Sequence, residues 1–207
     1  GLVKESNDAS GYLTEVIAVA VGKNHSVALK ENGTVWTWGE NSRGQLGDGS
    51  TDSALTAVQV LGPGGSGFLT NVTSIAAAGK QTFAIKEDGT LWGWGANNQD
   101  QLGVGGTSID DCFGSNDCSM TPFLINTGQD VKVVQVAAAE NHTAILKADG
   151  TVWVWGANEV EYDIILGTGS TSYTIDTPSQ VLGEGGTGIL RSIASIATGK
   201  AFILALD

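Results

Sequence analysis

One eight-residue pattern, written three times, constrains the fold of this chain more than any other feature. It reads Asn-Gly-Thr-Val-Trp-Thr-Trp-Gly at 32–39, Asp-Gly-Thr-Leu-Trp-Gly-Trp-Gly at 88–95 and Asp-Gly-Thr-Val-Trp-Val-Trp-Gly at 149–156. An Asn-Gly or Asp-Gly pair between apolar runs predicts a β-hairpin, because both turn residues tolerate positive φ. The Trp-x-Trp alternation places both indoles on one face of the following strand. All six tryptophans lie in these copies: Trp36, Trp38, Trp92, Trp94, Trp153 and Trp155.

Each copy belongs to a longer repeat, whose turn glycines Gly33, Gly89 and Gly150 lie 56 and 61 residues apart. Alanine is a poor strand former, so an Ala-rich strand at the start of every repeat indicates a place where neighbouring sheets converge. The innermost strands around a central channel are such a place. These Ala-rich segments are 17–22, 75–79, 136–139 and, in a fourth copy, 193–199.

Two further strands are predicted in each repeat. The second strand is almost continuously apolar, which predicts a sheet covered on both faces. It is expected at 25–29, 81–85 and 142–146. A last short strand is expected at 57–61, 122–125 and 178–182. Proline at the start of two of these strands suits an outer edge, where a missing N–H costs least.

Four short antiparallel strands per repeat, with small residues on the first and bulky ones further out, predict an all-β fold of propeller blades. A β-sandwich, the competing all-β fold, does not predict a period. We expect one repeat domain over residues 1–207. Its repeats are placed at approximately 12–62, 68–126 and 131–183, with a partial repeat at 189–207. The tryptophan pairs are then expected to pack in the wedge between blades.

The first repeat resembles the repeat of the regulator of chromosome condensation family. The resemblance rests on Gly-x-x-His-Ser-x-Ala-Leu from 22 to 29 and on Asn-Gly-x-Val-x-x-Trp-Gly-x-Asn-x-x-Gly-Gln-Leu-Gly from 32 to 47. The second repeat departs at Gln81 and Asp100, and the third loses the Gly-Gln pair and inserts residues 159–162. The resemblance implies a seven-bladed propeller. It also implies nucleotide exchange on a small GTPase, enzyme inhibition or service as an interaction module.

The fourth repeat ends after its second strand. An open array leaves strand edges unpaired and one blade face uncovered at each end. Either the chain is part of a longer propeller, or several chains complete one another. Our hypothesis is self-association into a ring or a filament.

The chain is acidic, with 22 Asp and Glu against 10 Lys and Arg and a net charge of −12. Such a surface is expected to repel nucleic acid and anionic membranes. No apolar run approaches the roughly 18 residues of a membrane helix, and no signal peptide is seen.

Two features point to an oxidising, glycosylating compartment. Cys112 and Cys118 are too few for a zinc site and favour a short disulfide, with free thiols as the alternative. Four Asn-x-Ser/Thr triplets, at Asn24, Asn32, Asn71 and Asn141, fit export into a glycosylating pathway but add little, because such triplets are common by chance. We therefore expect an extracellular or cell-surface protein.

The titratable residues give no catalytic pattern. His25 and His142 occupy the same repeat position, which Gln81 and Phe202 fill in the other copies, so a structural role is expected. Loop carboxylates could ligate calcium, although solvated acidic loops are the preferred interpretation. They are Asp48, Asp52, Asp110, Asp111, Asp117, Glu159, Glu161 and Asp163.

Two insertions are not needed by a blade, at 106–121 and 159–177. They carry Phe113, Tyr162 and Tyr173, which are candidate partner-binding residues because loops on a rigid scaffold often carry recognition. Tolerated sequence drift is the alternative.

The sequence predicts a non-catalytic propeller module that binds an unidentified protein, with no cofactor and no metal as first choice. The alternatives are a structural subunit that self-assembles through its open ends and a guanine nucleotide exchange factor. A glycan hydrolase would need two carboxylates roughly 5–10 Å apart.

Overall fold

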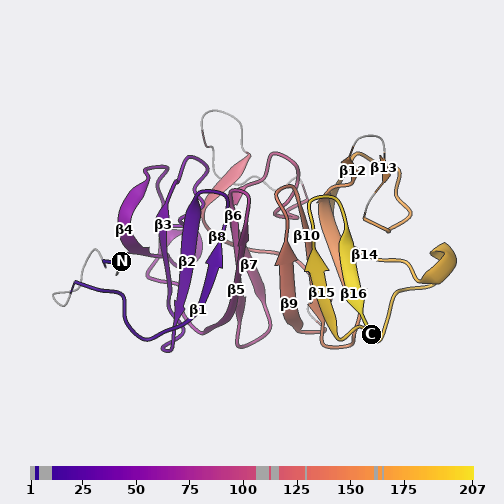
Figure 1. Ribbon diagram of the computed structural model, residues 1–207, viewed down its shortest axis with the longest axis horizontal. Helices are drawn as coiled ribbons and strands as arrows, with labels where there is room; N and C mark the ends of the chain where they lie inside the picture. Colours follow the sequence, from indigo (N-terminus) through magenta and orange to yellow (C-terminus); the bar gives the residue numbers. More distant parts are fainter. Residues whose placement is uncertain are drawn as a thin grey trace.

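The computed structural model describes residues 3–4, 11–105, 112, 117–128, 130–160, 163–164 and 166–207. It contains three four-stranded antiparallel sheets and one two-stranded sheet that follow one another along the chain (Figure 1). We number these sheets blades 1 to 4. Blade 1 consists of β1 (Val16–Val21), β2 (His25–Lys30), β3 (Val35–Gly39) and β4 (Ala54–Gln59). Blade 2 consists of β5 (Val72–Ala78), β6 (Gln81–Lys86), β7 (Leu91–Ala96) and β8 (Cys118–Leu124).

Blade 3 contains β9 (Val133–Ala138), β10 (His142–Lys147), β11 (Val152–Ala157) and β14 (Thr174–Gln180). Blade 4 is the hairpin of β15 (Ser195–Thr198) and β16 (Ile203–Leu206). A separate small hairpin, β12 (Glu159–Val160) with β13 (Asp163–Ile164), lies in the insertion of the third repeat and was not predicted. Two 3-10 turns, η1 (Pro63–Gly65) and η2 (Glu184–Gly186), follow β4 and β14. The predicted all-β fold of propeller blades is confirmed, and the array of sheets is open.

The outer strands differ from the prediction in their bounds. β8 and β14 begin four residues before the predicted starts at 122 and 178, so that Pro122 and Pro178 lie inside them. Both prolines fall where the ladder is irregular, between the pairs Gly93–Phe123 and Gly95–Ser119 in blade 2 and between Val154–Ser179 and Gly156–Ile175 in blade 3. A proline without an N–H is tolerated there because no regular ladder bond is required.

The first strands of successive blades approach one another. β1 contacts β5, β5 contacts β9, and β9 contacts β15. Ala18 and Ala20 of β1 pack on a buried cluster with Ile75 and Ala77 of β5. Small side chains permit this approach where the sheets converge.

The hairpin turn of each blade also binds the next blade. The carbonyl of Gly33 accepts a hydrogen bond from Val72 N at 3.1 Å, and Gly89 and Gly150 repeat the contact with Val133 and Ile193. Gly33 has φ of 76°, and a Cβ there would lie 3.2 Å from Asn71 N. Glycine is therefore required both for the turn and for the close approach.

In blades 2 and 3, the second tryptophan of the pair packs against the preceding blade. Trp94 and Trp155 are completely buried. Trp94 Nε1 donates to the carbonyl of Gln45 at 3.0 Å, and Trp155 Nε1 donates to the carbonyl of Gln101 at 2.8 Å. Trp38 has no preceding blade in the described part of the chain and is only half-buried.

The two ends of the array expose apolar side chains. Ile17, Val19 and Val21 of β1 are 62%, 70% and 68% exposed. Phe202, Leu204 and Leu206 at the other end are 55%, 61% and 64% exposed. Alternate residues of each strand share a face, so each set forms one apolar strip.

In the described part of the chain, no helix has the length and apolar character that a membrane crossing requires.

Candidate protein-interaction sites

Two surface features stand at opposite ends of the strands. One is a set of charged loops at the end where the first strand of each blade turns into the second, and we call it the loop face. The other is a groove between blades 2 and 3 at the end that carries the Asx-Gly hairpins, and we call it the hairpin-end groove.

The loop face is organised by three ion pairs, each of which joins two blades. Lys80 Nζ lies 2.7 Å from Glu40 Oε1, and Arg43 Nη1 lies 2.8 Å from both carboxylate oxygens of Asp117. Lys23 of blade 1 reaches past blade 2 to Glu140 of blade 3 at 2.9 Å. These contacts fix charged side chains from three blades relative to one another.

Hydrogen bonds from Lys80 and Ser42 lower the pKa of Glu40 to about 2. Lys23 likewise lowers the pKa of Glu140, first through its hydrogen bond and then through its charge. A polar hollow of about 210 Å³ lies among these groups, and its lining includes Arg43, Lys80 and Glu140. The loop face thus carries both signs of charge at neutral pH.

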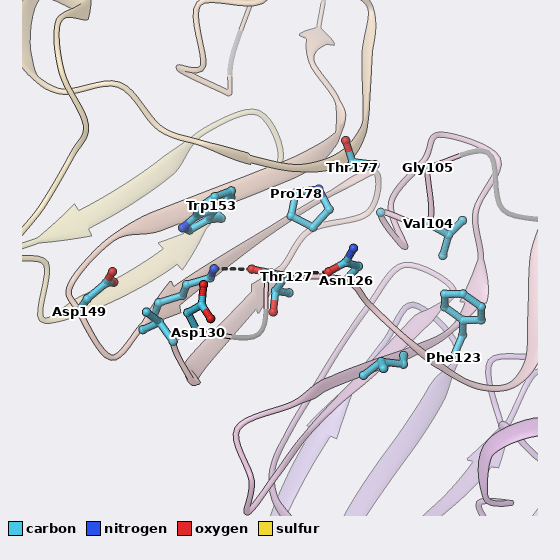
Figure 2. A pocket seen from close by; sticks show the side chains of 15 residues that line it. Val104, Gly105, Phe123, Asn126, Thr127, Asp130, Asp149, Trp153, Thr177 and Pro178 are labelled. Atoms are coloured by element: carbon cyan, nitrogen blue, oxygen red, sulfur yellow. Dashed lines mark hydrogen bonds between the residues drawn. The ribbon is translucent and has the colours of Figure 1, made fainter.

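The hairpin-end groove has a volume of about 730 Å³ (Figure 2). Its lining includes Phe123 and Leu124 at the end of β8 and Thr177 and Pro178 of β14. Gly103–Gly105 also line it. The β10–β11 hairpin contributes three further lining residues, Lys147, Asp149 and Trp153.

Lys147 is a buried cation with internal partners. Its Nζ donates to the carbonyl of Thr127 and lies 4.1 Å from the centroid of the Trp153 ring. Burial lowers the pKa of Lys147, while the charges of Asp149 and Asp130 act in the opposite direction. Figure 2 shows Asp130 near Thr127, and Asp149 at the end of the groove away from Gly105.

A hydrogen-bond chain fixes the half-buried Trp153. Trp153 Nε1 donates to Thr151 Oγ1 at 3.1 Å, and that hydroxyl donates to Asp149 Oδ1 at 2.7 Å. The Thr151 bonds lower the pKa of Asp149. The same chain occurs in the first two repeats, through Asn32, Thr34 and Trp36 and through Asp88, Thr90 and Trp92. The recurring Asx-Gly-Thr-x-Trp pattern therefore sets the position of its first indole through side-chain bonds.

The repeat histidines lie between blades. His25 Nε2 lies 2.9 Å from Thr82 Oγ1, and burial lowers the pKa of His25 to about 4. Burial also lowers the pKa of His142. In the second repeat, Gln81 fills the slot and donates to the carbonyls of Ala139 and Glu140 at 2.8 and 2.9 Å. These residues connect blades and do not converge with other reactive groups in the described part of the chain.

The structure joins Cys112 and Cys118 in a disulfide with a Cα–Cα distance of 5.9 Å. Of the three candidate loop aromatics, Phe113 and Tyr162 lie outside the described residues. Tyr173 is 74% exposed and precedes β14. It lies at the same end of the strands as the loop face, since the next residue, Thr174, pairs with Ala157, but it lines neither the polar hollow nor the hairpin-end groove.

The four predicted glycosylation sites are all exposed. Asn24 donates from Nδ2 to Glu40, and Asn32 accepts from Thr34 within its own turn. Asn71 adopts a φ of 59° in the connector before β5. Their glycosylation stays a prediction.

The candidate calcium ligands do not come together where they are described. Asp48 accepts hydrogen bonds from Asn41 and Ser50 within its loop, and Asp117 pairs with Arg43. Asp52 is exposed. Asp110, Asp111 and Glu161, and the side chains of Glu159 and Asp163, lie outside the description. Among the described residues, no group of three or more His, Cys, Asp or Glu could hold a metal ion.

Sequence reasoning missed the hairpin-end groove and the role of Lys147. Two signals could have indicated them. In each of the three full repeats, a lysine ends the second strand, at Lys30, Lys86 and Lys147, and lies over the first tryptophan of that repeat. The connector at 125–132 also lacks the Gly-rich composition of the connectors at 62–67 and 183–188.

Curated relatives match most of the chain. The chain is 30% identical over 191 residues to the human E3 ubiquitin-protein ligase HERC2, a match that spans 92% of this chain and 4% of the ligase. It is 33% identical over 145 residues to the human probable E3 ubiquitin-protein ligase HERC6, which spans 70% of this chain and 13% of that protein. The chain thus spans a small part of the relatives it matches.

Solved structures share the fold. Prp20p from Saccharomyces cerevisiae superimposes with a TM-score of 0.74 at 22% identity, covering 93% of this chain and 44% of that protein. Human WBSCR16 superimposes with a TM-score of 0.71 at 27% identity, covering 96% of this chain and 46% of that protein.

The expected extracellular location is wrong. The ubiquitin ligases and the histone-binding Prp20p that this chain resembles are intracellular proteins. The expectation depended on two cysteines and on Asn-x-Ser/Thr triplets. The triplets arise readily by chance, and a single short disulfide does not define a compartment.

Models of the regulator of chromosome condensation (RCC1) repeat match residues 32–85 and 88–146, and a second model of that repeat matches 16–45 and 133–160. With the blade architecture and the relatives above, these matches identify the protein: the chain belongs to the RCC1 repeat family.

Proposed function

We propose that this chain is a non-catalytic RCC1-type propeller module that recognises a protein partner through its loop face. One observation carries the proposal. Three ion pairs hold charged side chains from three blades in one arrangement around a shallow polar hollow. A broad surface with fixed charges of both signs suits a complementary protein surface, because charge complementarity speeds encounter and excludes wrong partners.

The family supports this role. Prp20p binds Gsp1p and histones, so a protein of this fold binds other proteins. At 22% identity, the likeness to Prp20p shows a shared fold and does not identify a shared partner. The partner of this chain is therefore to be found by experiment.

The test compares two charge-matched variants. Arg43→Gln with Lys80→Gln removes two cations from the loop face, whereas Lys4→Gln with Arg191→Gln removes two exposed cations outside the hollow. Surface ion pairs are worth about 0–1 kcal/mol, so both variants are expected to fold. Proteins cross-linked to the wild type are identified, purified and titrated calorimetrically against all three proteins.

We expect a partner whose affinity falls at least about tenfold for the loop-face variant and stays unchanged for the control, a difference of about 1.4 kcal/mol. A partner lost equally from both variants would contradict the loop-face assignment. If the partner is a small GTPase, release of labelled GDP separates exchange activity from simple binding. A rate accelerated by the chain would replace the non-catalytic proposal.

A second candidate function rests on the apolar strips at the two ends of the array. Ile17, Val19 and Val21 at one end and Phe202 and Leu204 at the other are each more than half exposed. Contiguous exposed apolar surface of this kind marks association sites. Under this proposal the 207-residue chain self-associates. Sedimentation velocity tests it: the mass should rise with concentration and fall for Val19→Lys, and a monomer at all concentrations would contradict it.

A further inference from the structure

We propose that the hairpin-end groove between blades 2 and 3 is a second binding site, which takes an extended, basic segment of polypeptide. It lies at the end of the strands opposite the loop face and does not depend on the function proposed for that face.

The groove exists because the described part of the chain covers one blade boundary and leaves the next one open. After β4, the connector forms η1, which contacts β8. A Cβ on Gly65 of η1 would lie 3.8 Å from the methyl group of Thr121, and Pro122 beside it is buried. The Thr-Pro pair of β8 is thus covered by the main chain of the connector.

The same Thr-Pro pair recurs in β14 without that cover. The connector from β8 to β9 forms no 3-10 turn in its described residues. Thr177 is exposed, Pro178 is half-buried, and both line the groove. A stretch of main chain occupies the first boundary, so the equivalent space at the second has the shape to take a stretch of polypeptide from outside.

The charges of the groove select a basic segment. Asp130 and Asp149 are exposed, and both act on the buried ammonium group of Lys147. That ammonium group already has the Thr127 carbonyl and the Trp153 ring as partners. It is therefore poorly placed to receive an anion, while the two carboxylates leave the groove net negative.

The apolar lining suits the stems of basic side chains. Trp153, Phe123 and Pro178 line the same groove. Arginine and lysine bury their methylene stems on such surfaces while the charged end reaches a carboxylate. The whole chain, at a net charge of −12, also favours approach of a cationic partner.

The probe is a fluorescein-labelled peptide of four Gly-Arg-Ala units. In two matched control peptides, every Arg is replaced by Gln or by Glu. Binding is measured by fluorescence anisotropy at near-physiological ionic strength. In parallel, the indole N–H signal of Trp153, assigned by its loss in Trp153→Phe, is followed by NMR during the titration.

The test variant is Asp130→Asn with Asp149→Asn. In the first repeat, Asn32 occupies the position equivalent to Asp149 and makes the same turn contacts. Asp149→Asn is therefore expected to preserve the hairpin. The control, Glu31→Gln with Asp52→Asn, removes two exposed carboxylates from blade 1. A third variant, Thr177→Arg, keeps both groove carboxylates and places a cation in the groove.

We expect the Arg peptide to bind, to shift the Trp153 signal and to lose at least about tenfold in affinity with the test variant and with Thr177→Arg. The control should bind within about twofold of the wild type, and the Gln and Glu peptides should bind weakly or not at all. Equal losses in test and control variants, or binding without a Trp153 shift, would show adsorption to the acidic surface and overturn the proposal.

Occupation of the groove by a second copy of the chain is tested separately. If wild-type dimers dissociate on Asp130→Asn with Asp149→Asn in sedimentation velocity, the groove is a self-association site and the proposal fails. Loss of the loop-face partner leaves this experiment unaffected, because its variants and probe concern only the hairpin-end groove.

Discussion

His25 of blade 1 donates a hydrogen bond from Nε2 to the hydroxyl of Thr82 in blade 2 across 2.9 Å. The direction of this hydrogen bond is fixed because the Thr82 hydroxyl donates its only proton to the carbonyl of Gln45, also at 2.9 Å. His25 Nδ1 is buried and has no hydrogen-bond partner among the described residues, so the ring must be neutral. At the next equivalent boundary, Ile203 stands where the threonine would be, and His142 Nε2 has no partner in the described part of the chain.

This arrangement predicts a pH-dependent stability. The pKa of His25 is about 4 in the folded chain against 6.5 for the free residue, so the unfolded chain binds the proton more tightly. The part of the free energy of unfolding that depends on the neutral His25 ring is fully present above pH 6.5. It is lost as the pH falls from 6.5 to about 4. The loss from His25 is roughly 3 kcal/mol at most.

Urea unfolding between neutral pH and pH 4 measures this effect. His25→Gln, which imitates Gln81 in the same slot, should have a flatter profile than the wild type. The pKa of His142 is lowered as well, so His142 should account for part of the pH dependence that remains in His25→Gln. An unchanged slope in His25→Gln would contradict the assignment.

Thr82→Val should cost more stability than Thr143→Val. Thr82 serves both His25 and the Gln45 carbonyl, whereas Thr143 donates to the Gln101 carbonyl at 2.9 Å. Each buried group left unpaired costs about 1–3 kcal/mol, so we expect Thr82→Val to lose the larger amount. Denaturant midpoints of the two variants provide the comparison, and equal losses would mean that the His25 bond contributes nothing.

Gly103→Ala should be strongly destabilising. Gly103 has φ of 66°, and a Cβ there would lie 2.8 Å from Trp155 Cδ1. We expect a loss of about 2–4 kcal/mol from backbone strain and overpacking together. Gly64→Ala is the control, because Gly64 has a similar φ of 62° with nothing within 4 Å. It should lose only about 1 kcal/mol in thermal unfolding, and similar losses for both would rule out the indole contact as the cause.

Reduction of the Cys112–Cys118 disulfide should lower stability moderately. The two cysteines are six residues apart, and closing a loop of that size in the unfolded chain is worth about 2 kcal/mol. We expect no free thiols in the denatured, unreduced chain and two after reduction, with a lower melting temperature. Cys112→Ser with Cys118→Ser should melt at the temperature of the reduced wild type. Free thiols in the unreduced chain would contradict the prediction.

The sequence alone determined the blade repeat. Asx-Gly turns, Trp-x-Trp strands and Ala-rich first strands carry local information, because turn conformation and side-chain alternation depend on neighbouring residues. The bounds of β8 and β14 were less accurate, since a bulge allowed Pro122 and Pro178 to lie inside strands that proline was expected to begin.

Only the tertiary structure decided which of these residues meet. Segments far apart in sequence meet in three places. Trp94 bonds to Gln45, and Lys23 reaches past a whole blade to Glu140. The groove that Trp153 borders is lined by residues from two blades. Identical Thr-Pro pairs therefore have different surroundings: Pro122 of β8 is buried beside the connector that forms η1, while Pro178 of β14 is half-buried and lines the groove. The difference arises from the connector between blades, whose path depends on packing and not on the repeat itself.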